Sequence, residues 1–108
     1  MPILTASGTQ TAVIGTEHTL NNPTGSKWYS AYVDLTNMAS GDNTELRVYV
    51  LVKVAGSYTQ YYIHTYTDSQ SPNMLVYVPP FPSDLGYKLT LKQTAGTGRA
   101  YDWRVYEV

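Results

Sequence analysis

Along most of this chain apolar and polar residues alternate with the period of two that is typical of β-strands, not the period of 3.6 that a helix requires. The clearest run covers residues 44–54, TELRVYVLVKV. Its core-facing positions are expected to be Leu46, Val48, Val50, Val52 and Val54. Because a one-residue slip would turn every side chain to the other face, we expect Val50→Asp to abolish the soluble protein.

Two further segments alternate as cleanly. In residues 28–35 the side chains expected to face the core are Tyr29, Ala31, Val33 and Leu35, and in residues 87–92 they are Tyr87, Leu89 and Leu91. Additional strands are expected at residues 12–20, 58–66, 74–78 and 100–108.

Turn-forming residues separate these strands. Residues 55–57 (AGS) predict a short hairpin, and residues 37–43, 69–73 and 95–98 predict connections. Residues 78–86 (VPPFPSDLG) contain three prolines, which lack the amide donor of a sheet interior. We therefore expect a loop or a sheet-crossing arm there.

No segment longer than about ten residues has helical spacing of its apolar positions. About seven strands with turns between them predict an all-β fold, an antiparallel two-sheet sandwich that is jelly-roll-like. An eight-stranded up-and-down barrel is the alternative. Residues 1–10 are small and mostly polar, so we expect a flexible or strapping N-terminal arm followed by a single β-sandwich domain over residues 11–108.

Composition narrows the function classes. The chain has 108 residues, the length of one domain, with 7 Lys and Arg against 8 Asp and Glu. This balance argues against a nucleic-acid partner bound through bulk positive charge. Cysteine is absent, which excludes a disulfide framework and a thiolate metal site. No apolar run approaches 18 residues, so no membrane partner is expected, and the start of the chain lacks the features of a secretory signal.

The residues that carry catalytic chemistry are sparse. His18 and His64 lie in separate predicted strands, and we expect His18 to orient a neighbouring loop by hydrogen bonds. Asp34, Asp42 and Glu45 are close in sequence, but turn formation explains Asp42 without a substrate or a calcium ion. We therefore predict no catalytic residues, no metal, no cofactor and no enzymatic activity.

Glycine and basic residues have structural explanations too. Residues 95–99 (AGTGR) lead into a strand pattern, so a hairpin turn is favoured over a phosphate-binding loop. Lys88, Lys92, Arg99 and Arg104 are expected to form a single-strand nucleic-acid groove only if they share a neighbourhood with exposed tyrosines.

Tyrosine is the unusual residue of this composition, with 11 copies against 1 phenylalanine and 2 tryptophans. Tyrosine suits surfaces that are half apolar and half wet. We expect an outward aromatic platform that stacks on sugar rings or forms a protein interface. Its candidate residues, facing an interface or a glycan, are Trp28, Tyr32, Tyr49, Leu51, Tyr62, His64 and Tyr66.

Three stretches carry a resemblance to a known group: residues 13–20 (VIGTEHTL), 32–50 (YVDLTNMASGDNTELRVYV) and 89–108 (LTLKQTAGTGRAYDWRVYEV). The chain resembles small virion structural proteins of tailed bacteriophages, of the capsid decoration or cement type. The resemblance implies a β-sandwich that binds the major capsid protein and stabilises the shell, commonly as a homotrimer. It implies location on the capsid surface of a virion after synthesis in the host cytoplasm, and it carries over no catalytic residue. The alternative is a carbohydrate-binding β-sandwich module that uses an exposed Trp/Tyr face, for example on a phage tail or fibre.

Overall fold

The computed structural model describes residues 3–24 and 26–108, which form eight β-strands and no helix. The strands are β1 Ile3–Thr11, β2 Glu17–Asn21, β3 Lys27–Asp34, β4 Asn43–Leu51, β5 Tyr58–Thr67, β6 Leu75–Ser83, β7 Tyr87–Ala95 and β8 Ala100–Glu107. The all-β prediction is confirmed. Within the described residues there is accordingly no helix with the length and apolar character that crossing a bilayer requires.

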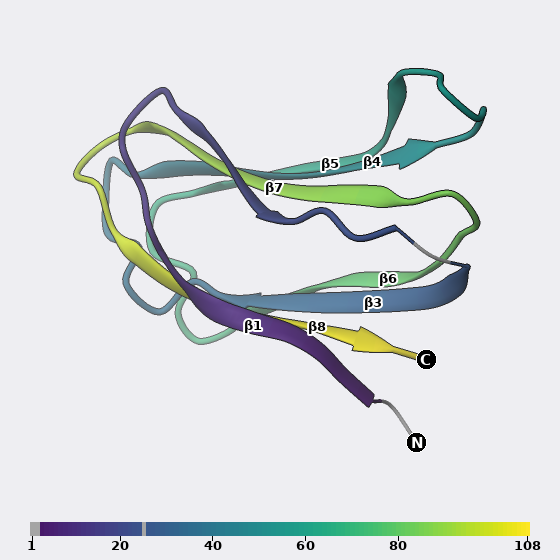
Figure 1. Cartoon of the computed structure of the whole chain (residues 1–108). Helices are drawn as coiled ribbons and strands as arrows, with labels where there is room; N and C mark the ends of the chain where they lie inside the picture. Colours follow the sequence, from purple (N-terminus) through teal and green to yellow (C-terminus); the bar gives the residue numbers. More distant parts are fainter. Residues whose placement is uncertain (1–2, 25) are drawn as a thin grey trace.

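The strands form two antiparallel four-stranded sheets that are stacked as two layers (Figure 1). Sheet A has the order β1-β8-β3-β6 and sheet B has the order β2-β7-β4-β5. Strands β1 and β8, β2 and β7, β3 and β6, and β4 and β5 are neighbours, as when a long hairpin is wrapped into a sandwich. This is a jelly-roll arrangement, so the predicted two-sheet sandwich is confirmed.

The core fills the space between the sheets. The inward alternation predicted for residues 28–35 and 87–92 is confirmed, since all seven apolar side chains named for these segments are buried. Around one end Tyr29, Phe81 and Tyr87 pack together, with ring centroids of Tyr29 and Tyr87 4.7 Å apart. A second cluster at the other end includes Leu35, Leu46 and Tyr101.

The long run of residues 44–54 is only partly a strand. Leu46 and Val48 are buried as predicted, and Val50 is half-buried. The prediction for Val52 and Val54 is wrong, because their side chains are 76% and 73% exposed. Strand β4 ends at Leu51, and a tight turn follows, so the sequence continues to alternate where the sheet no longer does. The turn between β4 and β5 projects beyond the body of the sandwich (Figure 1).

The proline-rich segment differs from expectation as well. Residues 78–83 belong to β6, so the prediction of a loop or crossing arm is wrong for them. Strand β6 is an edge strand, and one side of an edge strand needs no donors. The pairing of β6 with β3 shifts between Val78 and Phe81, which forms a bulge. Pro79 and Pro80 lie in this bulge, where no backbone amide donor is needed.

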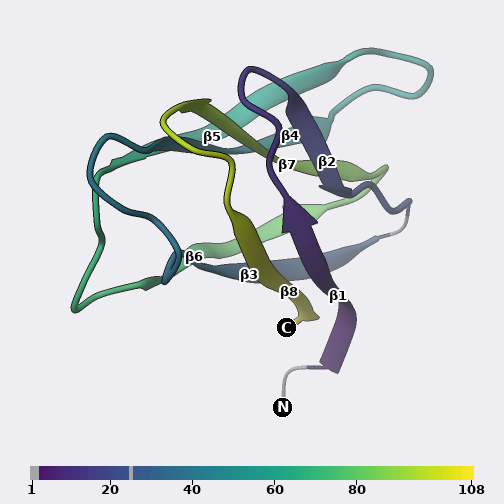
Figure 2. The same ribbon diagram turned by 90° about the vertical axis from the view of Figure 1, so that its left-hand side faces the viewer.

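The N-terminal segment also lies in a sheet. Residues 3–11 form β1, which pairs with β8 of the same chain, so these residues are not a free arm; residues 1 and 2 lie outside the described part (Figure 2). The strand expected at residues 12–20 begins only at Glu17. Residues 12–16 form a turn in which Gly15 has a φ of 83°.

Candidate functional site

The structure does not bring the seven predicted surface residues together. Trp28 and Tyr32 lie on the outer face of sheet A, whereas Tyr49 and Leu51 lie on the outer face of sheet B. The remaining three come from β5 and face the interior side of sheet B. These are Tyr62, His64 and Tyr66, which pair across the sheet with the inward residues of β4.

The β5 residues are therefore partly core. Tyr62 packs against one core cluster and Tyr66 against the other. Burial is the main reason why the pKa of Tyr66 is raised, and the neighbouring Tyr62 adds to this effect. His64 contributes its ring to this edge, with its centroid 4.5 Å from that of Tyr66. The sequence did not reveal this inward orientation because aromatic or apolar residues occur on both sides of β5.

The outer face of sheet B carries a polar network over β2, β7 and β4. Glu17 accepts hydrogen bonds from the hydroxyls of Tyr49 and Thr90, each at 2.7 Å, and lies 3.8 Å from Arg47. Arg47 also pairs with Glu45 at 2.7 Å. Partial burial opposes ionisation of Glu17, but these hydrogen bonds and the positive charge of Arg47 outweigh it and lower its pKa. The carboxylates of Glu17 and Glu45 and the hydroxyls of Tyr49 and Thr90 are thus bound within the protein, whereas Nε of Arg47 has no hydrogen-bond partner among the described residues.

The outer face of sheet A has a different composition. Exposed apolar side chains dominate two neighbouring strands, β3 and β6, where Trp28 is 54% exposed, Leu75 60% and Tyr77 61%. Tyr32 is the cross-strand partner of Tyr77, so both rings share this face. An exposed apolar patch of this kind usually marks an interaction site.

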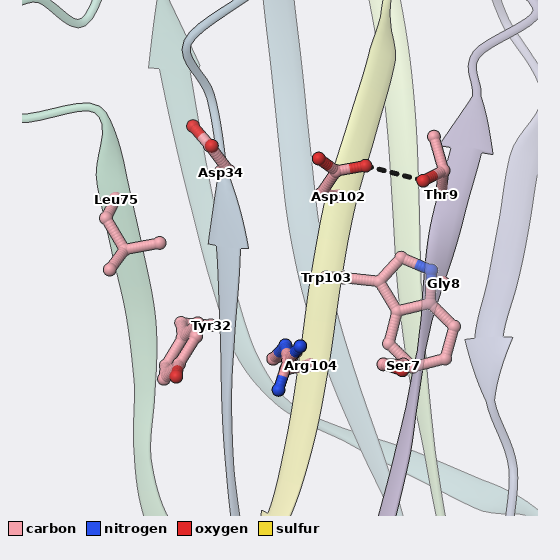
Figure 3. A pocket seen from close by; sticks show the side chains of 9 residues that line it. All are labelled: Ser7, Gly8, Thr9, Tyr32, Asp34, Leu75, Asp102, Trp103 and Arg104. Atoms are coloured by element: carbon pink, nitrogen blue, oxygen red, sulfur yellow. Dashed lines mark hydrogen bonds between the residues drawn. The ribbon is translucent and has the colours of Figure 1, made fainter.

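Two adjoining hollows mark this face. The first, of about 470 Å³, lies over β1, β8 and β3 and is lined by Ser7, Gly8, Thr9, Tyr32, Asp34, Leu75, Asp102, Trp103 and Arg104 (Figure 3). The second, of about 560 Å³, is lined by Ser30, Tyr32, Tyr77, Pro80, Tyr106 and Val108. Tyr32 lines both hollows, so they adjoin at this side chain, and we call the two together the trough.

A pair of tyrosines forms the floor between the hollows. The hydroxyls of Tyr32 and Tyr106 are hydrogen-bonded at 2.7 Å, and their ring centroids are 5.3 Å apart. The hydrogen bond raises the pKa of Tyr32 and lowers that of Tyr106, with nearby Arg104 adding to the lowering. Tyr32 thus contributes to the lining of both hollows and Tyr106 to that of the second.

Charged groups lie at one end of the trough. Asp34 on β3 is the cross-strand partner of Asp102 on β8, and Arg104 lies two positions further along the same strand (Figure 3). Thr9 donates a hydrogen bond to Asp102, and the backbone amide of Thr36 donates one to Asp34 at 2.9 Å. These bonds orient both carboxylates, and each carboxylate retains acceptor capacity for a ligand.

The acidic residues considered for a metal or for catalysis are separated. Asp34 faces outward from sheet A, Glu45 faces outward from sheet B, and Asp42 is buried in the connection between β3 and β4. Among residues 3–24 and 26–108 no group of three or more metal-ligating side chains is placed to hold an ion.

Asp42 organises one end of the sandwich. Its carboxylate accepts hydrogen bonds from the amides of Ala39 and Thr97 at 2.9 and 3.1 Å and from Nε of Arg99 at 2.7 Å. Burial opposes its ionisation, but the hydrogen bond from Arg99 and the two amide bonds outweigh burial and hold the pKa below its usual value. Gly96, with a φ of 88°, gives the carboxylate the room that a Cβ would take.

The remaining expectations have mixed outcomes. The imidazole of His18 accepts a hydrogen bond from the amide of Val13 at 3.0 Å, which confirms its role in orienting a loop. The four basic residues do not share a neighbourhood. Lys88 and Lys92 lie on the outer face of sheet B, Arg99 binds Asp42, and Arg104 lies on the outer face of sheet A.

Several residues of the trough were not predicted as site residues from the sequence. They are Ser7, Thr9, Ser30, Asp34, Leu75, Tyr77, Pro80, Asp102, Arg104 and Tyr106. Alternation in β8 does separate Asp102, Arg104 and Tyr106 from the inward residues of that strand. Nothing local indicates that β8 lies beside β3, because that pairing joins segments about seventy residues apart.

Comparison of the chain with protein-family models, with curated proteins and with solved structures found no match.

Proposed function

We propose that this protein is a non-enzymatic attachment protein that binds a protein surface through the outer face of sheet A. The observation that carries the proposal is the contrast between the two outer faces. Over β2, β7 and β4 sheet B presents polar groups that are bound to one another, whereas sheet A presents exposed Trp28, Leu75 and Tyr77, of which Leu75 and Tyr77 line the trough. Exposed aromatic residues are favoured at the centres of protein interfaces.

The specific partner follows from the resemblance to decoration proteins. We propose that the partner is the major capsid protein, that the chain acts on the surface of a virion and that it adds contacts that stabilise the shell. Jelly rolls occur in viral capsid proteins and in lectins, so the fold is compatible with this role by analogy only. The homotrimer implied by the resemblance is a separate expectation.

Co-sedimentation tests the proposal directly. Labelled protein is mixed with virus particles purified from the source of the sequence, and the bound fraction is measured. We expect saturable binding that the double variant Trp28→Ala/Tyr77→Ala weakens at least tenfold, since aromatic side chains at an interface centre contribute about 1.4 kcal/mol or more.

The matched control removes two exposed apolar side chains elsewhere. Val52→Ala/Val54→Ala alters the projecting turn, where both valines are exposed, and should bind as the unaltered protein does. Equal loss in both double variants, or no binding of the unaltered protein to particles, would refute the proposal.

Carbohydrate recognition by the same trough is the second candidate. It is favoured by the position of Asp34, Asp102 and Arg104 beside the ring of Tyr32 in one hollow. Sugars bind through stacking on aromatic rings and hydrogen bonds from hydroxyls to carboxylates. A glycan array would support this candidate if a defined glycan bound and binding was lost in Asp102→Asn and Tyr32→Ala. Binding to particles stripped of glycans would instead support the capsid partner.

A further inference from the structure

The edges of the two sheets differ in how well they are protected against pairing. An edge strand exposes unpaired backbone donors and acceptors, and folded proteins protect such edges with charges, prolines, bulges or short strands. The four edge strands here are β1 and β6 in sheet A and β2 and β5 in sheet B. These four strands differ in length, charge, proline content and regularity, and these properties decide at which edge another strand can add.

Two of these edges are protected. Strand β6 contains Pro79, Pro80 and Pro82 and a bulge opposite β3. Strand β2 has only five residues, includes Glu17 and shifts register beyond Thr19. Neither can offer a long, regular row of backbone groups.

The other two edges, β1 and β5, are long and uncharged. Strand β1 has a register shift between Leu4 and Ala6, and its regular part, residues 6–11, consists of small and polar residues with Gly8 among them. Strand β5 has ten residues without charge or proline. Its register shift lies before Tyr62, and residues 62–67 (YIHTYT) pair regularly with β4. Tyrosine, isoleucine and threonine favour strands, whereas alanine and glycine do not.

Apolar surface also gathers around β5. Ile63 is 46% exposed on its outer side and Tyr61 is 51% exposed. An almost wholly apolar hollow of about 290 Å³ lies beside Tyr61, lined also by Val50, Val52 and Phe81. A partner strand along residues 62–67 would pack against Ile63 as well as satisfy backbone groups, whereas the hollow lies just beyond that segment.

We propose that β5, within its regular segment of residues 62–67, pairs antiparallel with the same segment of a second copy of this chain, with a two-fold axis at one of its residues, which joins two B sheets into one eight-stranded sheet. A second copy fits this edge because an uncharged strand meets no repulsion from itself across a two-fold axis. The contact is isologous, so both copies use the same surface. It is independent of the attachment face on sheet A, and it makes a dimer instead of the trimer implied by the resemblance.

The geometry restricts the register. Residues directly opposite each other in an antiparallel pair point to the same face of the sheet. In a two-fold dimer a residue of β5 therefore lies opposite its own copy. Within the regular segment the central candidates are Ile63, His64 and Thr65.

Sedimentation equilibrium of the purified chain tests the association. We expect a monomer–dimer equilibrium, and we expect Thr65→Lys to raise the dissociation constant at least several-fold because two positive charges would then lie near the axis on the same face of the sheet. Two matched controls place a threonine-to-lysine substitution on β1 and β2, which are the other two edge strands that contain no proline. Thr19→Lys in β2 and Thr5→Lys in β1 should dimerise as the unaltered protein does.

Cysteine cross-linking tests the register. The chain has no cysteine, so any disulfide formed by a single introduced cysteine must join two copies. Opposed Cα atoms of an antiparallel pair are about 4.5–5.5 Å apart, a separation that a disulfide can span. One of Ile63→Cys, His64→Cys and Thr65→Cys should oxidise readily to a dimer, whereas Thr19→Cys should not.

Three results would overturn the proposal. One is a monomer at about 100 µM by sedimentation together with no preferential cross-link in β5. Another is a dimer that Thr65→Lys leaves unchanged. The third is association lost equally in Thr5→Lys, which would show that β5 pairs with β1 of the next copy instead. Circular dichroism and thermal melting of each variant separate a failure to fold from a failure to associate.

Discussion

The outer faces of sheets A and B belong to the same fold but differ in how far their side chains are already bound to one another. On sheet B, Glu17, Arg47 and Tyr49 bind one another, and Lys88 lies 4.5 Å from the ring centroid of Tyr49. On sheet A, Trp28 and Tyr77 are exposed, and the structure shows no hydrogen bond within the described residues for the hydroxyl of Tyr77. Polar groups that are already paired gain little from a partner, whereas exposed apolar rings gain from being covered.

This difference separates stability from binding. Changes on sheet B should affect unfolding more than recognition, and changes on sheet A should do the reverse. Substitutions in the core, at Asp42 and on the two faces should therefore lower the free energy of unfolding by amounts that decrease in this order.

The largest effect should come from the core on which both faces depend. Val48 is fully buried, so Val48→Asp places an unpaired carboxylate between the sheets, which costs several kcal/mol in a domain whose total stability is about 5–10 kcal/mol. We expect no soluble folded protein. The control Val52→Asp, at an exposed position, should express and melt as the unaltered chain does. A folded Val48→Asp protein would show that the register of β4 is different.

The next largest effect should come from Asp42, which belongs to neither face. Asp42→Ala leaves the amides of Ala39 and Thr97 without their acceptor and should lower the free energy of unfolding by about 1–3 kcal/mol at pH 7. Urea denaturation at pH 7 measures this loss.

Acid should reduce the contribution of Asp42. Because its pKa is lowered on folding, the ionised carboxylate stabilises the protein above the unfolded-state pKa of about 3.9, and this contribution is lost as the pH falls through the lower folded pKa. The difference between the unaltered protein and Asp42→Ala should therefore shrink from pH 7 towards pH 2. A difference that grows in acid would contradict this assignment.

A smaller effect is expected when one carboxylate on each face is replaced by an amide. Glu17→Gln weakens the network with Tyr49, Thr90 and Arg47 and should cost at most about 1 kcal/mol, because this face is partly solvated. Asp102→Asn, which affects one bond from Thr9, should cost less. Denaturation in parallel, at low and high salt, measures both; a greater loss in Asp102→Asn would reverse the comparison of the faces.

The smallest effect should come from the exposed rings of sheet A. Trp28→Ala and Tyr77→Ala should each change the free energy of unfolding by no more than about 0.5 kcal/mol. Tyr49→Ala on sheet B should cost more, since it removes the hydrogen bond to Glu17 and the contact with Lys88. If Trp28→Ala destabilises the chain more than Tyr49→Ala, its ring is a structural element and not a free binding surface.

Local pattern predicted the fold well where one side of a strand is clearly apolar. Alternation placed Tyr29, Ala31 and Val33 inside correctly. It failed at Val52, because alternation cannot report where a strand loses its neighbours, and at the prolines of β6, because a sequence does not show which strand lies at an edge.

The candidate site was less predictable for the same reason. Trp28 and Tyr32 were identified from their own strand, but the cross-strand partners of Tyr32, which are Tyr77 and Arg104, come from strands far away in the sequence. The inward position of Tyr62 was missed because β5 carries large side chains on both sides. A surface assembled across strands depends on long-range pairing, which two-residue periodicity does not encode.

The position of β8 also has a consequence for synthesis on the ribosome. This strand lies between β1 and β3, so β1 has no hydrogen-bonding neighbour in sheet A until residues 100–107 have been made. Strand β1 therefore stays unpaired in sheet A until β8 has been made. Folding of such a topology is slow, on the order of milliseconds to seconds, because distant segments must meet before any of them is stable. During translation the edge of β1 is therefore left without its partner for longer than that of any other strand of sheet A.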